Sequence, residues 1–188
     1  IAAPSAPTIS GVSAGDSSAT ITVAPGAGGG APASYTITAS PGGATCTVIS
    51  PATSCSVSPL TNGTSYTFSA TATNSTGTSA ATTSSAITPA GTPSAPSAPS
   101  AVRGNGQATV TVTPLAADAT GGKAITAYTV TAYDASGNAA GTPCQVIPAA
   151  TSCAVTGLTN GSAYTFKVSA TNGVATSASS VASAPVTP

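Results

Sequence analysis

The chain contains two copies of one sequence pattern. Residues 60–68, Leu-Thr-Asn-Gly-Thr-Ser-Tyr-Thr-Phe, return at 158–166 with two changes, and Pro-Ser-Ala-Pro at 4–7 returns at 96–99. The spacing between copies grows from 92 residues at the Pro motif to 98 at the Tyr motif, as expected when loops change length and strands do not. Because such self-similarity indicates repeated structural units, we predict two domains, 1–89 and 96–188, joined by a Pro-rich linker at 90–95.

Each copy of the Tyr motif opens a segment of alternating apolar and polar side chains. The first reads Tyr-Thr-Phe-Ser-Ala-Thr-Ala at 66–72, and the second reads Tyr-Thr-Phe-Lys-Val-Ser-Ala at 164–170. A period of two predicts half-buried β-strands, and no segment shows an amphipathic helical period. Other short alternating runs are separated by turn signals such as Asn-Gly. The predicted fold class is therefore all-β, with about seven strands in each of two β-sandwiches.

Charged residues are scarce enough to exclude several functions. The chain has three Asp, no Glu, two Lys, one Arg and no His, so only 3% of its residues are charged. We expect no nucleic-acid binding, because there is no basic patch to neutralise phosphates. Membrane insertion is not expected either, since no apolar run approaches the roughly 20 residues of a spanning helix. General acid–base catalysis lacks a group with a suitable pKa.

Four cysteines offer covalent support to a core that is poor in large side chains. Cys46 and Cys55 are separated by eight residues, and so are Cys144 and Cys153. Four cysteines allow three pairings, and the equal spacing in both halves favours one disulfide within each half. Four free thiols or a metal site are the alternatives, although no His and no Cys-x-x-Cys pair supports a metal. Disulfides would place the protein outside a reducing cytosol.

The Leu-x-x-Gly-x-x-Tyr-x-Phe motif, the later Ala-x-Asn and the opening Pro-x-x-Pro resemble fibronectin type III domains. The resemblance covers nearly the whole chain twice and is closest to bacterial extracellular versions rich in Thr, Ala and Gly. It implies two tandem immunoglobulin-like sandwiches, in which Tyr66 and Tyr164 form tyrosine corners. This sequence departs from the family at Val23 and Val112, where Trp is common, and in its added Cys pairs, which would lie near strands C′ and E.

Two segments match catalytic motifs by chance. Residues 11–15 fit Gly-x-Ser-x-Gly, but a nucleophile elbow needs a following helix and a His base. The Gly-rich segment 26–31 fits a loose dinucleotide fingerprint, but Pro32 and a predicted strand follow it instead of a helix. Asp118 and Asp134 flank one predicted strand and should lie roughly 20 Å apart, too far for paired acid and base. We therefore predict no enzyme activity, no cofactor and no metal.

These features favour a secreted or surface-exposed structural protein, as in a fibre, sheath, surface layer or adhesin stalk. An opening of Ile-Ala-Ala-Pro would suit a processed mature end. We predict self-association, because net charge is zero and the candidate last strands, 81–88 and 179–187, carry no charged residue to prevent strand addition. The partner would then be another copy of the chain.

Two other functions stay open at the level of the sequence. One is a spacer or accessory module of a larger secreted enzyme. The other is binding of a glycan or a cell-surface ligand through an exposed Tyr133 and the loops 26–33 and 116–123. Sequons at Asn62, Asn74 and Asn160 match the N-glycosylation pattern, but turn chemistry explains them more simply.

Overall fold

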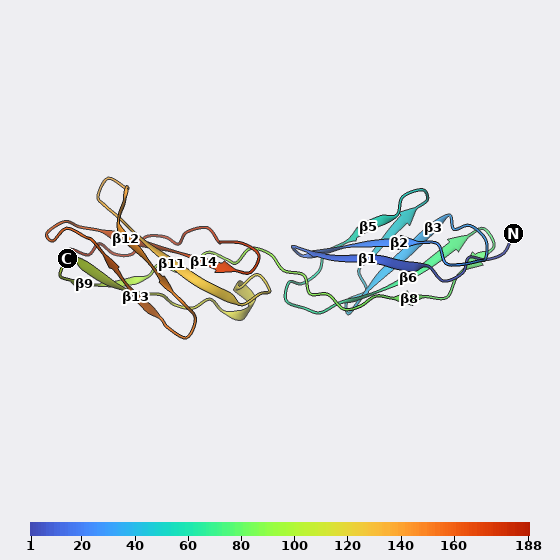
Figure 1. The fold of residues 1–188 in the computed structure, drawn as a ribbon, viewed down its shortest axis with the longest axis horizontal. Helices are drawn as coiled ribbons and strands as arrows, with labels where there is room; N and C mark the ends of the chain where they lie inside the picture. Colours follow the sequence, from blue (N-terminus) through green and yellow to red (C-terminus); the bar gives the residue numbers. More distant parts are fainter. The chain divides into compact units, whose positions relative to one another are not determined.

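A computed structural model describes residues 1–188 and is all-β apart from one 3-10 turn, η1 (Ala117–Ala119). The chain forms two compact units, Ile1–Gly91 and Thr92–Pro188 (Figure 1). The division between them falls inside the predicted linker 90–95. No helix is long and apolar enough to cross a membrane. The all-β prediction is confirmed.

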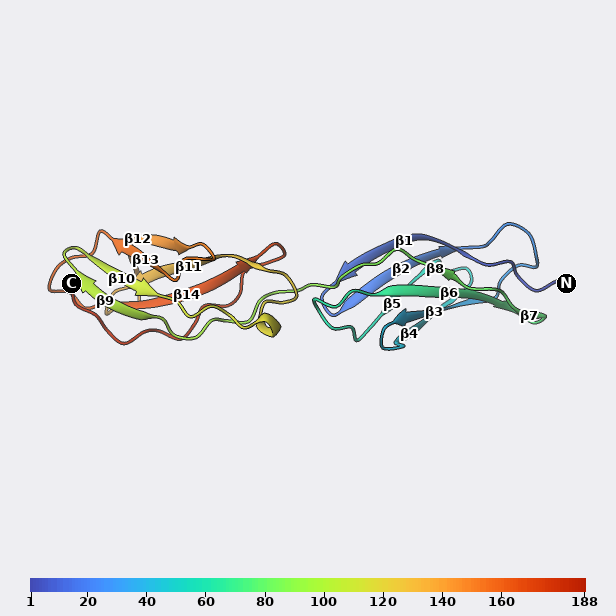
Figure 2. The same ribbon diagram turned by 90° about the horizontal axis from the view of Figure 1, so that it is seen from below.

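The first domain is a sandwich of two sheets. One sheet has the order β1-β2-β5 and the other has the order β4-β3-β6-β7, with β8 also pairing with β6. All pairs are antiparallel (Figure 2). The strands are β1 (Thr8–Gly15), β2 (Ser18–Ala24), β3 (Ser34–Ser40), β4 (Thr45–Ile49), β5 (Ser54–Val57), β6 (Thr67–Asn74), β7 (Gly77–Thr78) and β8 (Thr82–Thr83).

The second domain has the same strand order, but its two sheets join into one. The path runs β14-β11-β12-β13-β10-β9, and the junction is a single pair between Thr142 of β12 and Thr156 of β13. The strands are β9 (Ser100–Gly104), β10 (Gln107–Thr111), β11 (Ile125–Tyr133), β12 (Ala139–Val146), β13 (Ser152–Thr156) and β14 (Thr165–Asn172).

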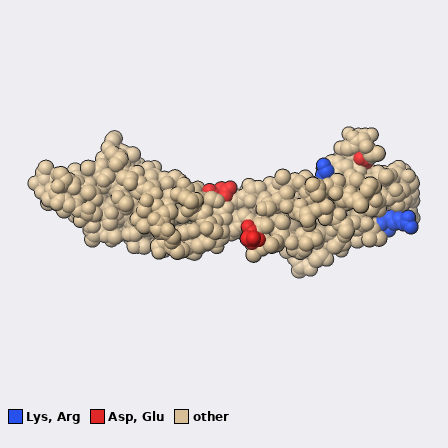
Figure 3. All heavy atoms as spheres, turned by 180° about the vertical axis from the view of Figure 1, so that it is seen from behind, with Lys and Arg blue, Asp and Glu red and all other residues tan.

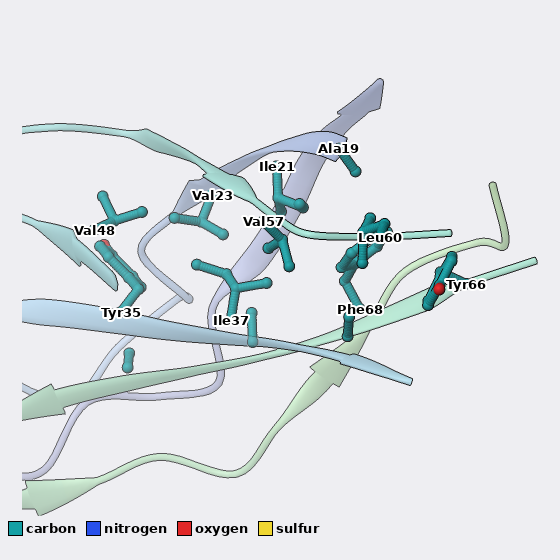
Figure 4. Close-up of a cluster of buried hydrophobic side chains, with 13 residues drawn as sticks. Ala19, Ile21, Val23, Tyr35, Ile37, Val48, Val57, Leu60, Tyr66 and Phe68 are labelled. Atoms are coloured by element: carbon teal, nitrogen blue, oxygen red, sulfur yellow. The ribbon is translucent and has the colours of Figure 1, made fainter. Parts of the chain in front are cut away.

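The alternating side chains of each domain close over one another as a separate core. In the first domain Phe68 is fully buried and lies beside Leu60 in a cluster of mostly aliphatic side chains (Figure 4). In the second domain Phe166 takes the same role. Val23 and Val112, at the positions where relatives of the family often carry Trp, are both buried and leave each core without a large indole. Burial of apolar area is the main favourable term in folding, so cores this light need other support.

The prediction of regular last strands at 81–88 and 179–187 is wrong. In the first domain only β8 and an isolated bridge at Ile87 have strand geometry there. In the second domain residues 179–187 contain only a bridge between Val186 and Tyr164. Both segments still run beside a long strand, β6 in the first domain and β14 in the second. Serines in each segment supply hydrogen bonds in place of a regular backbone ladder.

Serines spaced three residues apart make this replacement in the second domain. The backbone N–H of each serine donates to the carbonyl of one β14 residue. The serine hydroxyl accepts a hydrogen bond from the N–H of that same β14 residue. The hydroxyl also donates to the carbonyl of the residue that follows the serine. The distances lie between 2.7 and 3.0 Å. The pairs are Ser177 with Ala170, Ser180 with Val168, and Ser183 with Phe166.

The first domain uses two serines in the same way. Ser79 bonds to both backbone groups of Ala72, and Ser84 bonds to both backbone groups of Phe68. The serine side chains of the first domain are half-buried, whereas the three in the second domain are buried. A buried N–H without a partner is costly, so these hydroxyls keep both long strands satisfied at a sheet edge.

Candidate functional site

Each domain carries a disulfide between its two sheets. Cys46 lies on β4 and Cys55 on β5, strands of opposite sheets, and their Cα atoms are 6.1 Å apart. Cys144 on β12 and Cys153 on β13 are joined in the same way, with Cα atoms 5.9 Å apart. No cysteine is free. Each bond therefore ties the sandwich together at one edge, beside the thin core.

The two motif tyrosines fix the connection that crosses the end of each sandwich. The Tyr66 hydroxyl accepts a hydrogen bond from the backbone N–H of Thr61 at 3.0 Å, and the Tyr164 hydroxyl accepts one from Thr159 at 3.1 Å. The bond from Thr159 is the main reason that the pKa of Tyr164 is lowered. Both rings are buried. These hydroxyls serve the fold and are not available to a substrate.

The Asn-Gly turns next to these tyrosines hold the first hairpin of each domain, a role that the sequence did not reveal. Asn62 accepts from the N–H of Ser17 through Oδ1 and donates from Nδ2 to the Asp16 carboxylate, at 2.8 and 2.7 Å. In the second domain Asn160 accepts from the N–H of Gly106 and donates to Asn105, both at 2.7 Å. Hydrogen bonds to the first hairpin thus occupy the side-chain amides of Asn62 and Asn160, two of the three sequon asparagines.

The carboxylates do not form a catalytic pair. Asp118 is exposed on η1, before β11 begins, and Asp134 follows the end of β11. Asp134 accepts from the backbone N–H groups of Asn138 and Ser136, both at 2.9 Å, and the bond from Asn138 is the main cause of its lowered pKa. No three metal-ligating side chains gather anywhere in the chain. The carboxylate of Asp134 orders its own hairpin loop.

Residues 11–15 lie within β1 and its turn into β2, so the Gly-x-Ser-x-Gly match is a strand. The Gly-rich segment 26–31 packs against the first residues of the chain: Gly30 donates to the Ala3 carbonyl at 3.2 Å, and Pro4 pairs with Gly29. Neither segment meets a helix. Both chance matches therefore lack the structure that their chemistry requires.

Tyr133 was expected to be exposed, and this expectation is wrong. Its ring is half-buried, and the Lys167 ammonium lies 5.2 Å from the ring centre, on the neighbouring strand β14. This arrangement is a cation–π contact. Tyr133 is therefore not the fully exposed aromatic side chain that was predicted.

The family model of the fibronectin type III domain matches the chain twice, at residues 2–88 and 94–185. The chain belongs to the fibronectin type III family. In the family's terms β1, β2 and β5 are strands A, B and E, whereas β3, β4 and β6 are C, C′ and F. The disulfide thus joins C′ to E, where the added Cys pairs were predicted to lie.

Three solved structures are similar to the chain at low identity, and the one with a TM-score above 0.5 supports the same fold. A titin segment, domains A168–A170, is 19% identical, with a TM-score of 0.62, and this chain spans 66% of it. The FN1–FN3 domains of chicken CNTN1 are 20% identical, with a TM-score of 0.47 and 67% of that chain covered. A two-domain segment of chicken tenascin is 20% identical, with a TM-score of 0.44 and 99% covered. This chain is covered at 99 to 100% in each case. No curated protein matches.

The fibronectin type III loops at 26–33 and 116–123 border two open grooves. The groove in the first domain, about 320 Å³, is lined by Pro4, Ser5 and the segments 25–26 and 28–32. The groove in the second domain, about 390 Å³, is mainly apolar, and Leu115, Ile125 and Tyr128 lie in its wall. The Tyr128 hydroxyl accepts from the N–H of Leu115 at 2.8 Å. Neither groove is lined by a charged side chain.

Proposed function

We propose that this chain is a non-catalytic, extracellular structural protein that self-associates in a fibre, sheath, surface layer or adhesin stalk. The observation that carries the proposal is its almost uncharged surface, presented on two disulfide-tied fibronectin type III domains. The family commonly provides structural, adhesion and spacer modules.

The surface charges are few and scattered. The chain has three basic and three acidic side chains in 188 residues, and Figure 3 shows wide areas of each domain without any charged atom. Net charge away from zero is what normally keeps soluble proteins apart. A chain without that repulsion is suited to contact other copies of itself.

The extracellular setting is supported by the cysteines. Two disulfides persist only where the surroundings are oxidising, and each of them joins the two sheets of one domain. A structural role without chemistry is supported by the buried tyrosine hydroxyls and by the separated carboxylates described above. We also propose a bacterial source for the chain, on its Thr-, Ala- and Gly-rich composition.

The test is the mass of the oxidised chain in solution as its concentration rises. Light scattering after size-exclusion chromatography should show species heavier than the 17.3 kDa monomer. A strictly monomeric chain at millimolar concentration would contradict self-association. The same chain in 1 M salt is the control, because an association that does not rest on charge should survive screening.

A spacer module within a larger protein is a second candidate. The titin and CNTN1 segments that resemble this chain hold further domains, and the chain spans about two thirds of each. A spacer needs only stable domains and a short connection, both of which this chain has. The intact mass of the protein in its native source distinguishes the two: a much heavier polypeptide that includes an enzyme domain favours the spacer.

A further inference from the structure

The first domain has one sheet edge, at β1, with which no other strand of the chain pairs. β1 pairs with β2 on one side only, and in Figure 2 it runs along the outline of the domain with no strand beyond it. At eight residues it is as long as any strand of that domain, and it contains no charged residue and no proline, although its pairing with β2 shifts by one residue between Ile9 and Gly11. Long edge strands usually carry such residues, because they block pairing with another chain.

The backbone groups along this edge have no partner within the chain. In an antiparallel pair every second residue directs its N–H and C=O away from the neighbouring strand. The nearest bonds on the open side lie just outside the strand or at its last residue: Thr82 donates to the Pro7 carbonyl at 2.6 Å, and Ala90 donates to the Gly15 carbonyl at 3.2 Å. Between these two points the open side of β1 is unpaired.

A groove lies along the first half of this edge. It has a volume of about 290 Å³, with residues 9–12 of β1 on one wall and residues 82–85 of the last segment on the other. The lining is mostly polar and has no charged group. An incoming strand could therefore approach the β1 backbone without displacing a side chain that is packed in the core.

The other edges of the molecule are closed in different ways. The β4–β5 edge is bridged by Cys46–Cys55, and the last segment of each domain is irregular, with serine hydroxyls bonded to its carbonyls. In the second domain the strand that corresponds to β1 is β9, which has five residues and carries Arg103. Arg103 pairs with Ala108 as Ala14 pairs with Ala19, so it occupies the position of Ala14.

We propose that two copies of this chain pair through β1, as antiparallel neighbours in one continuous sheet. The proposal rests on the self-association proposed above and names the surface that mediates it. A two-fold arrangement lets the same strand supply donors and acceptors to its copy. Arg103 blocks the corresponding edge of the second domain, so this contact alone joins two copies, and the larger assembly proposed above needs a second contact surface.

The direction of pairing follows from the only charge near the strand. Asp16 lies in the turn directly after β1. In a parallel pair the two Asp16 carboxylates would lie side by side and repel each other. In an antiparallel pair they lie at opposite ends, separated by roughly 25 Å at about 3.3 Å per residue.

The test exchanges the side chains that distinguish the two edges. Ala14→Arg places on β1 the residue that β9 already carries, and we expect it to raise the dimer dissociation constant about tenfold or more, since each incoming strand must then cover a charged side chain at the edge. Thr20→Arg is the matched control: Thr20 is exposed on the interior strand β2, so the same charge there should leave the dimer intact. Arg103→Ala should open a second edge and produce species heavier than a dimer.

Sedimentation of the four oxidised proteins over a range of concentrations gives the outcome. A wild-type dimer that is lost in Ala14→Arg and kept in Thr20→Arg supports the pairing. If the wild type associates and Ala14→Arg associates equally well, the β1 interface is wrong and self-association stands. If the wild type is monomeric throughout, both proposals fail. Circular dichroism of each variant checks that the fold is retained.

Discussion

At the edge where strands C′ and E meet, the two domains are built differently. In the first domain β4 has five residues and does not pair with β5, so the Cys46–Cys55 bond is the direct link between the sheets there. In the second domain β12 has eight residues and pairs with β13 at Thr142 and Thr156, in addition to its disulfide. The disulfide therefore contributes more to holding the two sheets together in the first domain than in the second.

The difference originates in the hairpin between strands C and C′. The hairpin of the second domain is five residues longer, since Cys144 follows Tyr128 by 16 positions whereas Cys46 follows Tyr35 by 11. Its loop is ordered by the Asp134 carboxylate. The extra length lets β12 begin earlier and reach β13. A loop insertion has thus altered the closure of a sandwich while its core stayed the same.

The largest effect should come from the shared part of the two domains, the buried phenylalanines. Phe68→Ala and Phe166→Ala should each cost about 3–5 kcal/mol, because the cavity left behind adds to the lost burial. Each variant should destabilise only its own domain. Urea titration followed by the backbone NMR signals of both domains would measure this. Equal destabilisation of both domains by one variant would contradict two separate cores.

Removal of the disulfides should destabilise the two domains to different extents. Closing a loop of ten residues contributes about 2.5 kcal/mol in the chain-entropy model. We expect the double variant Cys46→Ala/Cys55→Ala to lose at least this much, and Cys144→Ala/Cys153→Ala to lose less, because Thr142 and Thr156 still join its sheets. The same NMR-detected urea titration measures both. A larger loss in the second domain would overturn the comparison.

The serine bonds to the last long strand give a third, smaller contrast. Ser180→Ala should cost about 1–2 kcal/mol, because it leaves the N–H of Val168 without a partner in a buried position. Ser84→Ala should cost less, since Ser84 is half-buried and water can replace its hydroxyl. Ser179→Ala is the control, because Ser179 is exposed and makes no such bond. Equal losses for Ser179→Ala and Ser180→Ala would exclude this role.

The smallest effect should be an acid dependence of the second domain's stability that comes from Asp134. The backbone bond from Asn138 lowers the pKa of Asp134 below its ordinary value of 3.8. A carboxylate with a lowered folded pKa contributes stability above its unfolded pKa and loses it as the pH falls through the folded pKa. Wild type should therefore lose slightly more stability than Asp134→Asn between about pH 5 and pH 2. Parallel curves for the two proteins would contradict this contribution.

Much of the fold was predictable because apolar and polar residues alternate without interruption in strands such as β6 and β14. The disulfide edge was also within reach, since the same Cys spacing recurs in both halves. The last segments were not, because a Ser spacing of three at 177, 180 and 183 is hard to distinguish in a chain so rich in Ser and Thr. Side-chain hydroxyls replaced the ladder there, and β-propensity alone cannot show that.

The position of Tyr133 was misjudged for a different reason. Its exposure depends on Lys167, which lies 34 residues later in the sequence and meets it only through the pairing of β11 with β14. Likewise, that β1 is an open edge follows only from the pairing of all the other strands. Both features depend on strand register, which a single sequence does not specify directly.

The central claim is that each half of the chain is a separate β-sandwich with its own disulfide. Disulfide mapping of the native, unreduced chain tests this claim most directly. Digestion without reduction, followed by mass spectrometry, should yield peptides that contain Cys46 linked to Cys55 and Cys144 linked to Cys153. A bond between one half and the other, or four free thiols, would contradict the account.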